Sequence, residues 1–375
     1  MNPIVAEVER RGRLTFRDFM ELALYHPEAG YYTRPRSGAG PVGATGDFIT
    51  APSATPLFGR TAARLIGRLH AELGEPLTLV ELGAGEGFFL STVTGELTGG
   101  ELGRVVAVEL ADWARARLQE RCPQAEVSHR LASFPHAQGP TVLFASELYD
   151  ALPVHRVTVR RHAGTLALAE FYVVAGQSGR LHWEVGELSD PGLENHLAAR
   201  NVTLEEGQIA EIRPALERHH AEHLAWCGRN AVAIVVEYGY PARQLYNAKA
   251  RRLGSLTGYR GHAHVDDVLS DPGQIDLTAH VDFDDLMNSA ADLGWERGVP
   301  RPLGVFLALH GITDLLPTAV KAGEELSAED WAELAAVKRL LHPAGMGGDL
   351  KVLVQGKGPA WAAYRRVATP PPAEA

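Results

Sequence analysis

Two glutamates and three glycines in the first third of the chain have the types and spacing of a ligand-binding site. Glu81 lies two residues before the first of three alternating glycines, Gly83, Gly85 and Gly87, and Glu109 follows 24 residues after the second. Because glycine has no Cβ, such a loop lets backbone approach a ligand closely. A carboxylate at position 81 would repel a phosphate and attract an ammonium group, whereas one at position 109 can accept both hydroxyls of a ribose. The set therefore predicts a nucleotide-type cofactor with a cationic amino-acid end, which describes S-adenosylmethionine.

The spacing of the glycines separates this loop from a dinucleotide site. A dinucleotide fingerprint has the pattern G-x-G-x-x-G, so that a pyrophosphate sits on the helix N-terminus. Here the pattern is G-x-G-x-G, and Phe88 stands where the third dinucleotide glycine would be. A methyl donor is therefore favoured over NAD, although a tight turn without a ligand is an equal alternative for the loop taken alone.

Two further carboxylates, Glu147 and Asp150, follow the apolar run TVLFA at residues 141–145. In doubly wound sheets the ligand lies beyond the carboxyl ends of the strands, so both side chains are expected where an acceptor would meet the cofactor. There they could hold a cationic acceptor and take its proton, which makes them the candidate catalytic pair. A helix N-cap and a loop hydrogen bond are the structural alternative.

Alternating strands and helices are expected to position these residues. The glycine loop joins a buried strand over Leu77–Leu82 to a helix that opens at Phe88, and an amphipathic helix over Thr55–Leu73 precedes it. Further apolar runs predict strands over 104–110, 141–145, 230–237, 275–281 and 350–355. This alternation predicts an α/β fold with a doubly wound, Rossmann-like sheet.

Other segments have a different pattern. Residues 154–186 alternate apolar and polar side chains between glycine-containing breaks, which predicts antiparallel strands. A helix is expected over Ile209–Trp226, and it carries His219, His220 and His223. No glutamate completes an H-E-x-x-H motif there, so a polar helix face is favoured and no metal site is predicted.

The domain organisation follows from these patterns. Residues 1–54 are expected to form lead-in helices and a loop that lines the cofactor cleft. Residues 55–365 are expected to form the Rossmann-like domain, with insertions at about 155–229 and 284–345, and residues 366–375 a disordered proline-rich tail.

Composition excludes several classes of protein. The 375 residues are 45% hydrophobic, which suffices for a sizeable core, and carry a net charge of −10 with no run of Lys or Arg, so nucleic acid is not expected as a partner. No apolar stretch is long enough to span a membrane. Cys122 and Cys227 lie outside any C-x-x-C spacing, which favours a reducing compartment. The first residues mix acids and bases without an apolar stretch, so the expected location is cytoplasmic.

The chain resembles the MidA-like family of S-adenosylmethionine-dependent methyltransferases in seven segments spread over nearly its whole length. ELGAGEG at 81–87 is common to many methyltransferases, whereas the other six are specific in combination. Those six are GYYT at 30–33, GDFITAP at 46–52, SELYDALPV at 146–154, EYGY at 237–240, GSLTGYRGH…DLTAHVDF at 254–283 and MGGDLKVL at 346–353.

The resemblance implies a class I methyltransferase fold with large inserted segments, S-adenosyl-L-methionine as methyl donor and S-adenosyl-L-homocysteine as product. It supports Gly83, Gly85 and Gly87 at the cofactor, Asp47 and Phe48 in the same cleft, and Glu147 and Asp150 on the acceptor side. Ser53 and Ser146 depart from the family, which usually has Glu and Asn at these places. In a mitochondrial relative the reaction is dimethylation of a protein arginine.

Methyl transfer to a protein side-chain nitrogen, with arginine favoured, is the leading hypothesis for function, and it makes a protein acceptor the expected partner. The alternatives are an assembly chaperone that binds the cofactor and a methyltransferase that acts on a small molecule. A homodimer remains open. Fold alone does not decide among these functions.

Overall fold

The computed structural model describes residues 2–35, 40–43, 46–323 and 325–368, and it divides into two compact units. Unit 1 comprises Met1–Phe48, Tyr149–Glu217 and Tyr238–Leu286, and unit 2 comprises Ile49–Leu148, Arg218–Glu237 and Met287–Ala375. The domain boundaries expected from the sequence differ from this division. Residues 155–217 and 238–286 join the N-terminal segment in unit 1, whereas most of the expected insertion at 284–345 belongs to unit 2.

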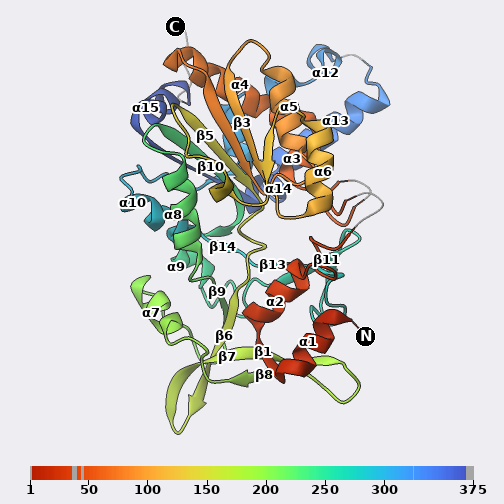
Figure 1. The fold of residues 1–375 in the computed structure, drawn as a ribbon, viewed down its shortest axis with the longest axis vertical. Coiled ribbons are helices and arrows are strands. Elements are labelled where there is room, and N and C mark those ends of the chain that lie inside the picture. Colours follow the sequence, from red (N-terminus) through yellow and green to blue (C-terminus); the bar gives the residue numbers. More distant parts are fainter. Residues whose placement is uncertain (1, 36–39, 44–45, 324, 369–375) are drawn as a thin grey trace. The chain divides into compact units, whose positions relative to one another are not determined.

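Unit 2 is built on a twisted sheet in the order β15-β16-β10-β5-β2-β3-β4 (Figure 1). Strands β2 to β5 and β10 pair in parallel, and β15 pairs with β16 antiparallel. All six residues of β2 are buried, as the apolar run predicts for a strand covered on both faces. The strand bounds are β2 Leu77–Leu82, β3 Leu102–Val108, β4 Glu126–Ser128, β5 Thr141–Ser146, β10 Ala231–Tyr240, β15 Arg301–Pro302 and β16 Leu350–Lys357. The doubly wound, Rossmann-like sheet predicted from the sequence is confirmed.

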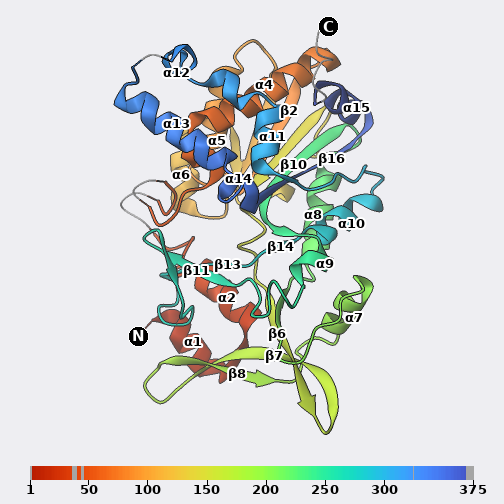
Figure 2. The same ribbon diagram turned by 180° about the vertical axis from the view of Figure 1, so that it is seen from behind.

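Helices pack on both sides of this sheet, as the two opposite views show (Figures 1 and 2). The longest is α4, Pro56–Leu73, which starts at a cap where the Thr55 hydroxyl accepts from the Leu57 amide and ends at Gly74 in the left-handed conformation. The helices before β10 are α3 Ala51–Ala54, α4, α5 Phe88–Glu96, α6 Asp112–Arg121 and α8 Leu216–Trp226. Those after it are α10 Phe283–Ala291, α11 Leu303–Leu309, α12 Thr318–Ala322, α13 Ala328–Leu341, α14 Met346–Asp349 and α15 Gly358–Val367, with 3-10 turns at Leu131–Ser133 and Ile312–Leu315.

Unit 1 contains an antiparallel sheet in the order β1-β7-β6-β9, with β8 on β7. Its strands are β1 Arg13–Thr15, β6 His155–His162, β7 Thr165–Ala175, β8 Leu181–Gly186 and β9 Ile209–Ile212. The antiparallel strands predicted for residues 154–186 are therefore confirmed. The rest of unit 1 comprises α1 Pro3–Arg11, α2 Phe16–Tyr25, α7 Gly192–Ala199, α9 Ala242–Leu245, a small sheet of β11 Thr257–Arg260, β12 Ala263–Val265 and β13 Asp276–Thr278, and β14 Val281–Asp282.

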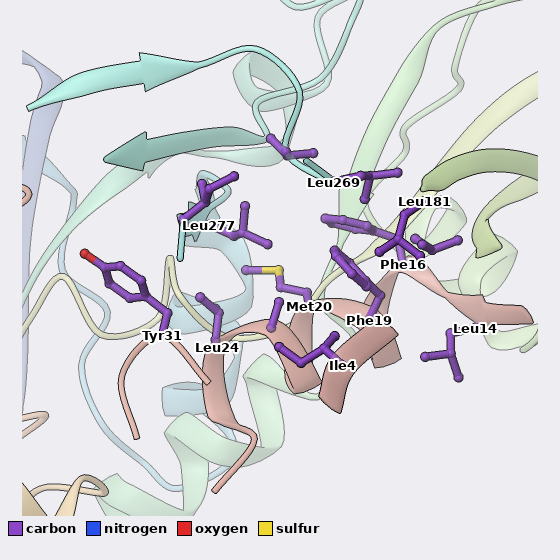
Figure 3. Close-up of a cluster of buried hydrophobic side chains, with 14 of the residues drawn as sticks. Ile4, Leu14, Phe16, Phe19, Met20, Leu24, Tyr31, Leu181, Leu269 and Leu277 are labelled. Atoms are coloured by element: carbon purple, nitrogen blue, oxygen red, sulfur yellow. The ribbon is translucent and has the colours of Figure 1, made fainter. Parts of the chain in front are cut away.

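A buried apolar cluster holds the N-terminal helices within unit 1 (Figure 3). Phe16, Phe19, Met20 and Leu24 line one face of α2 and are each fully buried. Their side chains meet a set from distant parts of the chain, which includes Ile4, Leu14, Tyr31, Leu181, Leu269 and Leu277. The helical spacing of the apolar residues in the sequence thus corresponds to a packed face.

Two expectations about elements need correction. The helix expected over Ile209–Trp226 begins only at Leu216, because residues 209–212 form β9 against β6 and Pro214 cannot donate a backbone hydrogen bond. Residues 366 and 367, which were expected in the tail, are the last residues of α15, and residues 369–375 lie outside the described part of the chain.

Candidate functional site

The candidate site of unit 2 lies at the carboxyl ends of four adjacent parallel strands. The glycine loop follows β2, Glu109 follows β3 and Glu147 follows β5. Glu237 lies one residue beyond the β10 residue that pairs with Ser146 of β5. Strand order reverses at β2, which has β3 on one side and β5 on the other, so this edge is the switch point at which open α/β sheets bind ligands.

The glycine loop has the backbone that its sequence predicts. Gly83, Gly85 and Gly87 have φ angles of 67°, 53° and 81°, in the region that favours glycine. A Cβ on Gly83 would lie 3.0 Å from Leu148, and one on Gly87 would lie 3.1 Å from Leu118. A Cβ on Gly85 would meet no described atom within 4 Å. Gly85 therefore faces open space, as expected of the glycine that a ligand approaches.

Glu109 is fixed against this loop by two backbone hydrogen bonds. Its Oε2 accepts from the Gly85 amide at 2.9 Å, and its Oε1 accepts from the Ala111 amide at 2.8 Å. Burial raises the pKa of Glu109 above the usual range, while these two amides act in the opposite direction. Each carboxylate oxygen can accept a second hydrogen bond, so the side chain is oriented and still able to bind a ribose.

Glu81 carries a buried oxygen that lacks a hydrogen-bond partner in this site. It lies inside β2 and is 5% exposed, and its Oε2 has no hydrogen-bond partner among the residues the structure describes. Burial and then the negative charge of Glu109 raise its pKa well above the usual range. A cationic ligand would lower the pKa of Glu81 and of Glu109, because a nearby positive charge favours the ionised form of a carboxyl group. The glycine cradle and this orphaned oxygen fit S-adenosylmethionine, whose α-ammonium and sulfonium groups are both positively charged.

Glu147 has an unusual backbone conformation for its residue type. Its φ is 52°, whereas side chains other than glycine seldom adopt positive φ and do so at some energetic cost. Its amide donates to Val236 O, and its Oε1 accepts from the Ala51 amide, at the start of α3, at 2.9 Å. The capping contact weighed as an alternative is therefore present at one oxygen.

Glu237 is a functional candidate that the sequence indicated only by its place at a strand end. It is fully buried, and its Oε1 accepts from the Leu148 amide at 2.8 Å. Ser146, the last residue of β5, has a buried hydroxyl without a hydrogen-bond partner among the described residues. Two carboxylates and a hydroxyl are thus presented at the ends of neighbouring strands.

The remaining predicted site residues, Asp47, Phe48 and Asp150, belong to unit 1. Asp47 accepts from the Tyr31 hydroxyl at 2.7 Å and from the Gly261 amide at 2.8 Å, which is loop chemistry of the kind expected for an acid in a turn. Phe48 packs against the apolar cluster of Figure 3. Burial raises the pKa of Asp150 to about 6, and the nearby Arg213 opposes that rise.

Asp276 is another buried acid of unit 1, and no pattern in the sequence marks it. It is 3% exposed and accepts from the Tyr32 hydroxyl at 2.7 Å. Burial raises its pKa to about 7, and the negative charges of Asp150 and Asp47 add to the rise. In the sequence Asp276 is a polar residue between two apolar ones, which is the usual pattern of an exposed strand position.

One of the three histidines of α8 departs from the expected polar helix face, whereas His219 and His223 are partly exposed. His220 is fully buried, and its Nε2 lies 2.8 Å from Oε1 of Gln355. Burial lowers the pKa of His220 to about 4, so its imidazole is neutral near pH 7. Within the described part of the chain, no helix combines the length and the apolar character that crossing a membrane requires.

Comparison with known proteins agrees with the predicted fold and methyl donor. A family described as "Putative S-adenosyl-L-methionine-dependent methyltransferase" matches residues 57–300. The chain is 24% identical over 336 residues to the zebrafish (Danio rerio) protein arginine methyltransferase NDUFAF7, mitochondrial, covering 77% of this chain and 71% of that protein. It is 26% identical over 337 residues to the Caenorhabditis elegans homolog, covering 82% and 75%.

Two solved structures from Burkholderia thailandensis have a similar fold. The first is bound to S-adenosyl-homocysteine, has a TM-score of 0.81 and is 26% identical, with 96% of this chain and 94% of that chain covered. The second has a TM-score of 0.77 and is 25% identical, with 94% and 91% covered.

Proposed function

This chain belongs to that family of S-adenosylmethionine-dependent methyltransferases, and we propose that it methylates an arginine side chain of a protein. Membership confirms the predicted resemblance, the methyl donor and the class of reaction. The identity of the methyl acceptor is the part that we propose. It is supported by relatives that are named protein arginine methyltransferases.

The observation that carries the proposal is the pair Glu147 and Glu237 at the ends of β5 and β10. Arginine presents five N–H donors in a planar fork, which two carboxylates can hold in a fixed orientation. Two hydrogen bonds hold Glu147 in its positive-φ conformation. Its amide donates to Val236 O, and its side chain accepts from the Ala51 amide. Such strain is commonly retained where it positions a functional group.

The protein itself would orient the donor and the acceptor and would control where the extra proton of the guanidinium lies. S-adenosylmethionine, when bound, supplies a methyl group on a sulfonium that is already a good leaving group. Glu81 and Glu109 would hold the donor, and the two carboxylates Glu147 and Glu237 would align the guanidinium and favour positive charge on its distal nitrogens. A guanidinium has a pKa above 12, so localising that charge leaves the reacting nitrogen the electron pair that it needs.

Three residues of unit 1 also have proposed roles, namely Asp47, Phe48 and Asp150. Asp47 and Phe48 are proposed to line the cofactor cleft, and Asp150 to contact the acceptor. Variants Asp47→Asn and Asp150→Asn separate these roles. The first should weaken S-adenosyl-homocysteine binding, and the second should lower only the methylation rate.

The test uses purified full-length protein, radiolabelled methyl donor and a protein extract from cells that lack this chain. After acid hydrolysis, label should be recovered in methylated arginine. Glu147→Gln should remove the label while S-adenosyl-homocysteine still binds. Label in another amino acid, or in small molecules alone, would refute the arginine assignment. An assembly chaperone would bind the cofactor and give no label at all.

Location and oligomeric state are separate parts of the proposal. We propose a cytoplasmic protein, whereas the named relatives are mitochondrial. Fractionation of cells that carry a tagged copy tests this. A homodimer would appear as twice the monomer mass of 40.5 kDa in light scattering.

A further inference from the structure

Unit 1 holds a buried cluster of polar side chains that the proposed methyl transfer does not use. His196 lies on α7, Asp282 ends β14, and Asp285 is in the first turn of α10. Asp282 and Asp285 are 2% and 1% exposed, and the His196 side chain is 8% exposed. Arg200 and Glu217 lie beside them.

Three atoms of this cluster lack hydrogen-bond partners. They are Nε2 of His196 and the Oδ2 atoms of Asp282 and Asp285, and each is buried with no such partner among the described residues. Nε of the neighbouring Arg200 also lacks one and lies 3.4 Å from Oδ2 of Asp282. One ligand atom from each of the three side chains lies within 4.8 Å of the other two. Buried polar atoms without partners are rare, so three of them on side chains whose ligand atoms lie this close together indicate a missing ligand.

The charges of the cluster indicate that the ligand is a cation. Asp282 and Asp285 place two buried carboxyl groups beside one guanidinium, that of Arg200, which also binds the partly exposed Glu217. The guanidinium bonds Oδ1 of Asp285 and lies 3.4 Å from Oδ2 of Asp282, so it neutralises only part of the charge. A cation bound here would favour the ionised forms of Asp282 and Asp285, whose charges are otherwise costly to bury.

We propose that His196, Asp282 and Asp285 bind one divalent transition-metal ion. Imidazole together with two carboxylates suits Zn²⁺ or Mn²⁺ better than Ca²⁺, which prefers a shell made of oxygen alone. Ligands bonded at about 2.0–2.2 Å to one ion lie up to about 4.4 Å apart, so small side-chain movements would close the site. The ion would join α7 to the start of α10.

No pattern in the sequence marks this site, and no metal was predicted there. His196 is separated from Asp282 by 86 residues, and no known motif links them. Only the fold brings them together.

The experiment uses untagged protein freed of metal by a chelator and then titrated with ZnCl2, MnCl2 or MgCl2. Calorimetry should show one Zn²⁺ or Mn²⁺ per chain, with a higher melting temperature on binding. His196→Gln keeps both carboxylates and Arg200 but should weaken affinity at least about tenfold, since even loss of an outer-shell partner costs that much. Co²⁺ should give visible absorption in wild type that this variant lacks.

His182→Gln is the matched control, because His182 is exposed on β8 of the same unit. It should bind metal as wild type does. Asp282→Asn provides a second loss-of-ligand variant if His196→Gln does not fold. Absence of stoichiometric Zn²⁺ or Mn²⁺ binding, or equal binding by the control and ligand variants, would overturn the proposal and leave an ion-pair network around Arg200.

Discussion

The buried carboxyl of Asp276 gives a prediction whose size can be worked out from the structure. Its pKa rises from 3.8 to about 7 because the side chain is buried and faces the negative charges of Asp150 and Asp47. The folded state therefore keeps a proton that the unfolded state has already lost between about pH 4 and pH 7. Stability from this group is fully present below the unfolded pKa and is lost as pH rises through the folded pKa.

The free energy of unfolding should fall by about 4 kcal/mol as Asp276 ionises, because its pKa is raised by about 3 and each pKa unit corresponds to about 1.4 kcal/mol. Asp276→Asn removes the titration and keeps an oxygen to accept from Tyr32. The difference in free energy of unfolding between variant and wild type should therefore grow from pH 4.5 to pH 7 and stay constant above it. Urea denaturation across that range measures the difference.

Two further variants sharpen this test. Asp266→Asn changes an exposed aspartate of the same unit and should follow wild type at every pH. Asp150→Asn removes a charge that raises the pKa of Asp276, so the transition should move to lower pH. If wild type and Asp276→Asn instead lose stability in parallel from pH 5 to pH 8, the carboxyl is ionised in the folded protein and the reasoning fails.

Glu109→Ala should weaken S-adenosyl-homocysteine binding by about 1–3 kcal/mol through lost hydrogen bonds, and unchanged affinity in calorimetry would exclude the ribose contact. Gly85→Val should abolish binding and keep the circular dichroism of the fold, because its side chain would meet no described atom within 4 Å, although strain at a φ of 53° should lower the melting temperature. Residual affinity near wild type would mean that the ligand lies elsewhere. Glu147→Gln should lower the methylation rate by around a hundredfold at nearly constant cofactor affinity. A normal rate with a lowered melting temperature would show that Glu147 only caps α3. DNA and RNA should not bind at about 200 mM salt, given the net charge of −10, and a filter-binding signal that persists there would contradict this.

Local patterns allowed the cofactor side of the site to be predicted from the sequence. The run from Leu77 to Leu90 contains its own strand, turn and helix signals, and β2, the loop and α5 follow them. The contact between Glu109 and Gly85 spans 24 residues within one β/α unit. Regular β/α alternation fixes such a contact, because consecutive parallel strands end at the same edge.

Local sequence patterns did not predict contacts between residues that are far apart in the chain. Residues 209–212 are apolar enough for a helix or a strand, and only their pairing with β6 decides the outcome. Tyr32 meets Asp276 across 244 residues of chain, so nothing near either residue marks the buried acid. Glu147 was located at its strand end, but its positive φ depends on contacts with Ala51 and Val236.

The division of the chain also determines how the protein can be synthesised. The chain crosses between the units five times, and the last crossing follows Leu286. Strand β16, near the C-terminus, lies between β15 and β10 inside the sheet of unit 2. A nascent chain on the ribosome can therefore complete unit 1 first, whereas the sheet of unit 2 keeps an open edge at β10 until residue 357 has emerged. An early stop codon would leave that edge exposed to aggregation, so neither unit can be obtained by simple truncation.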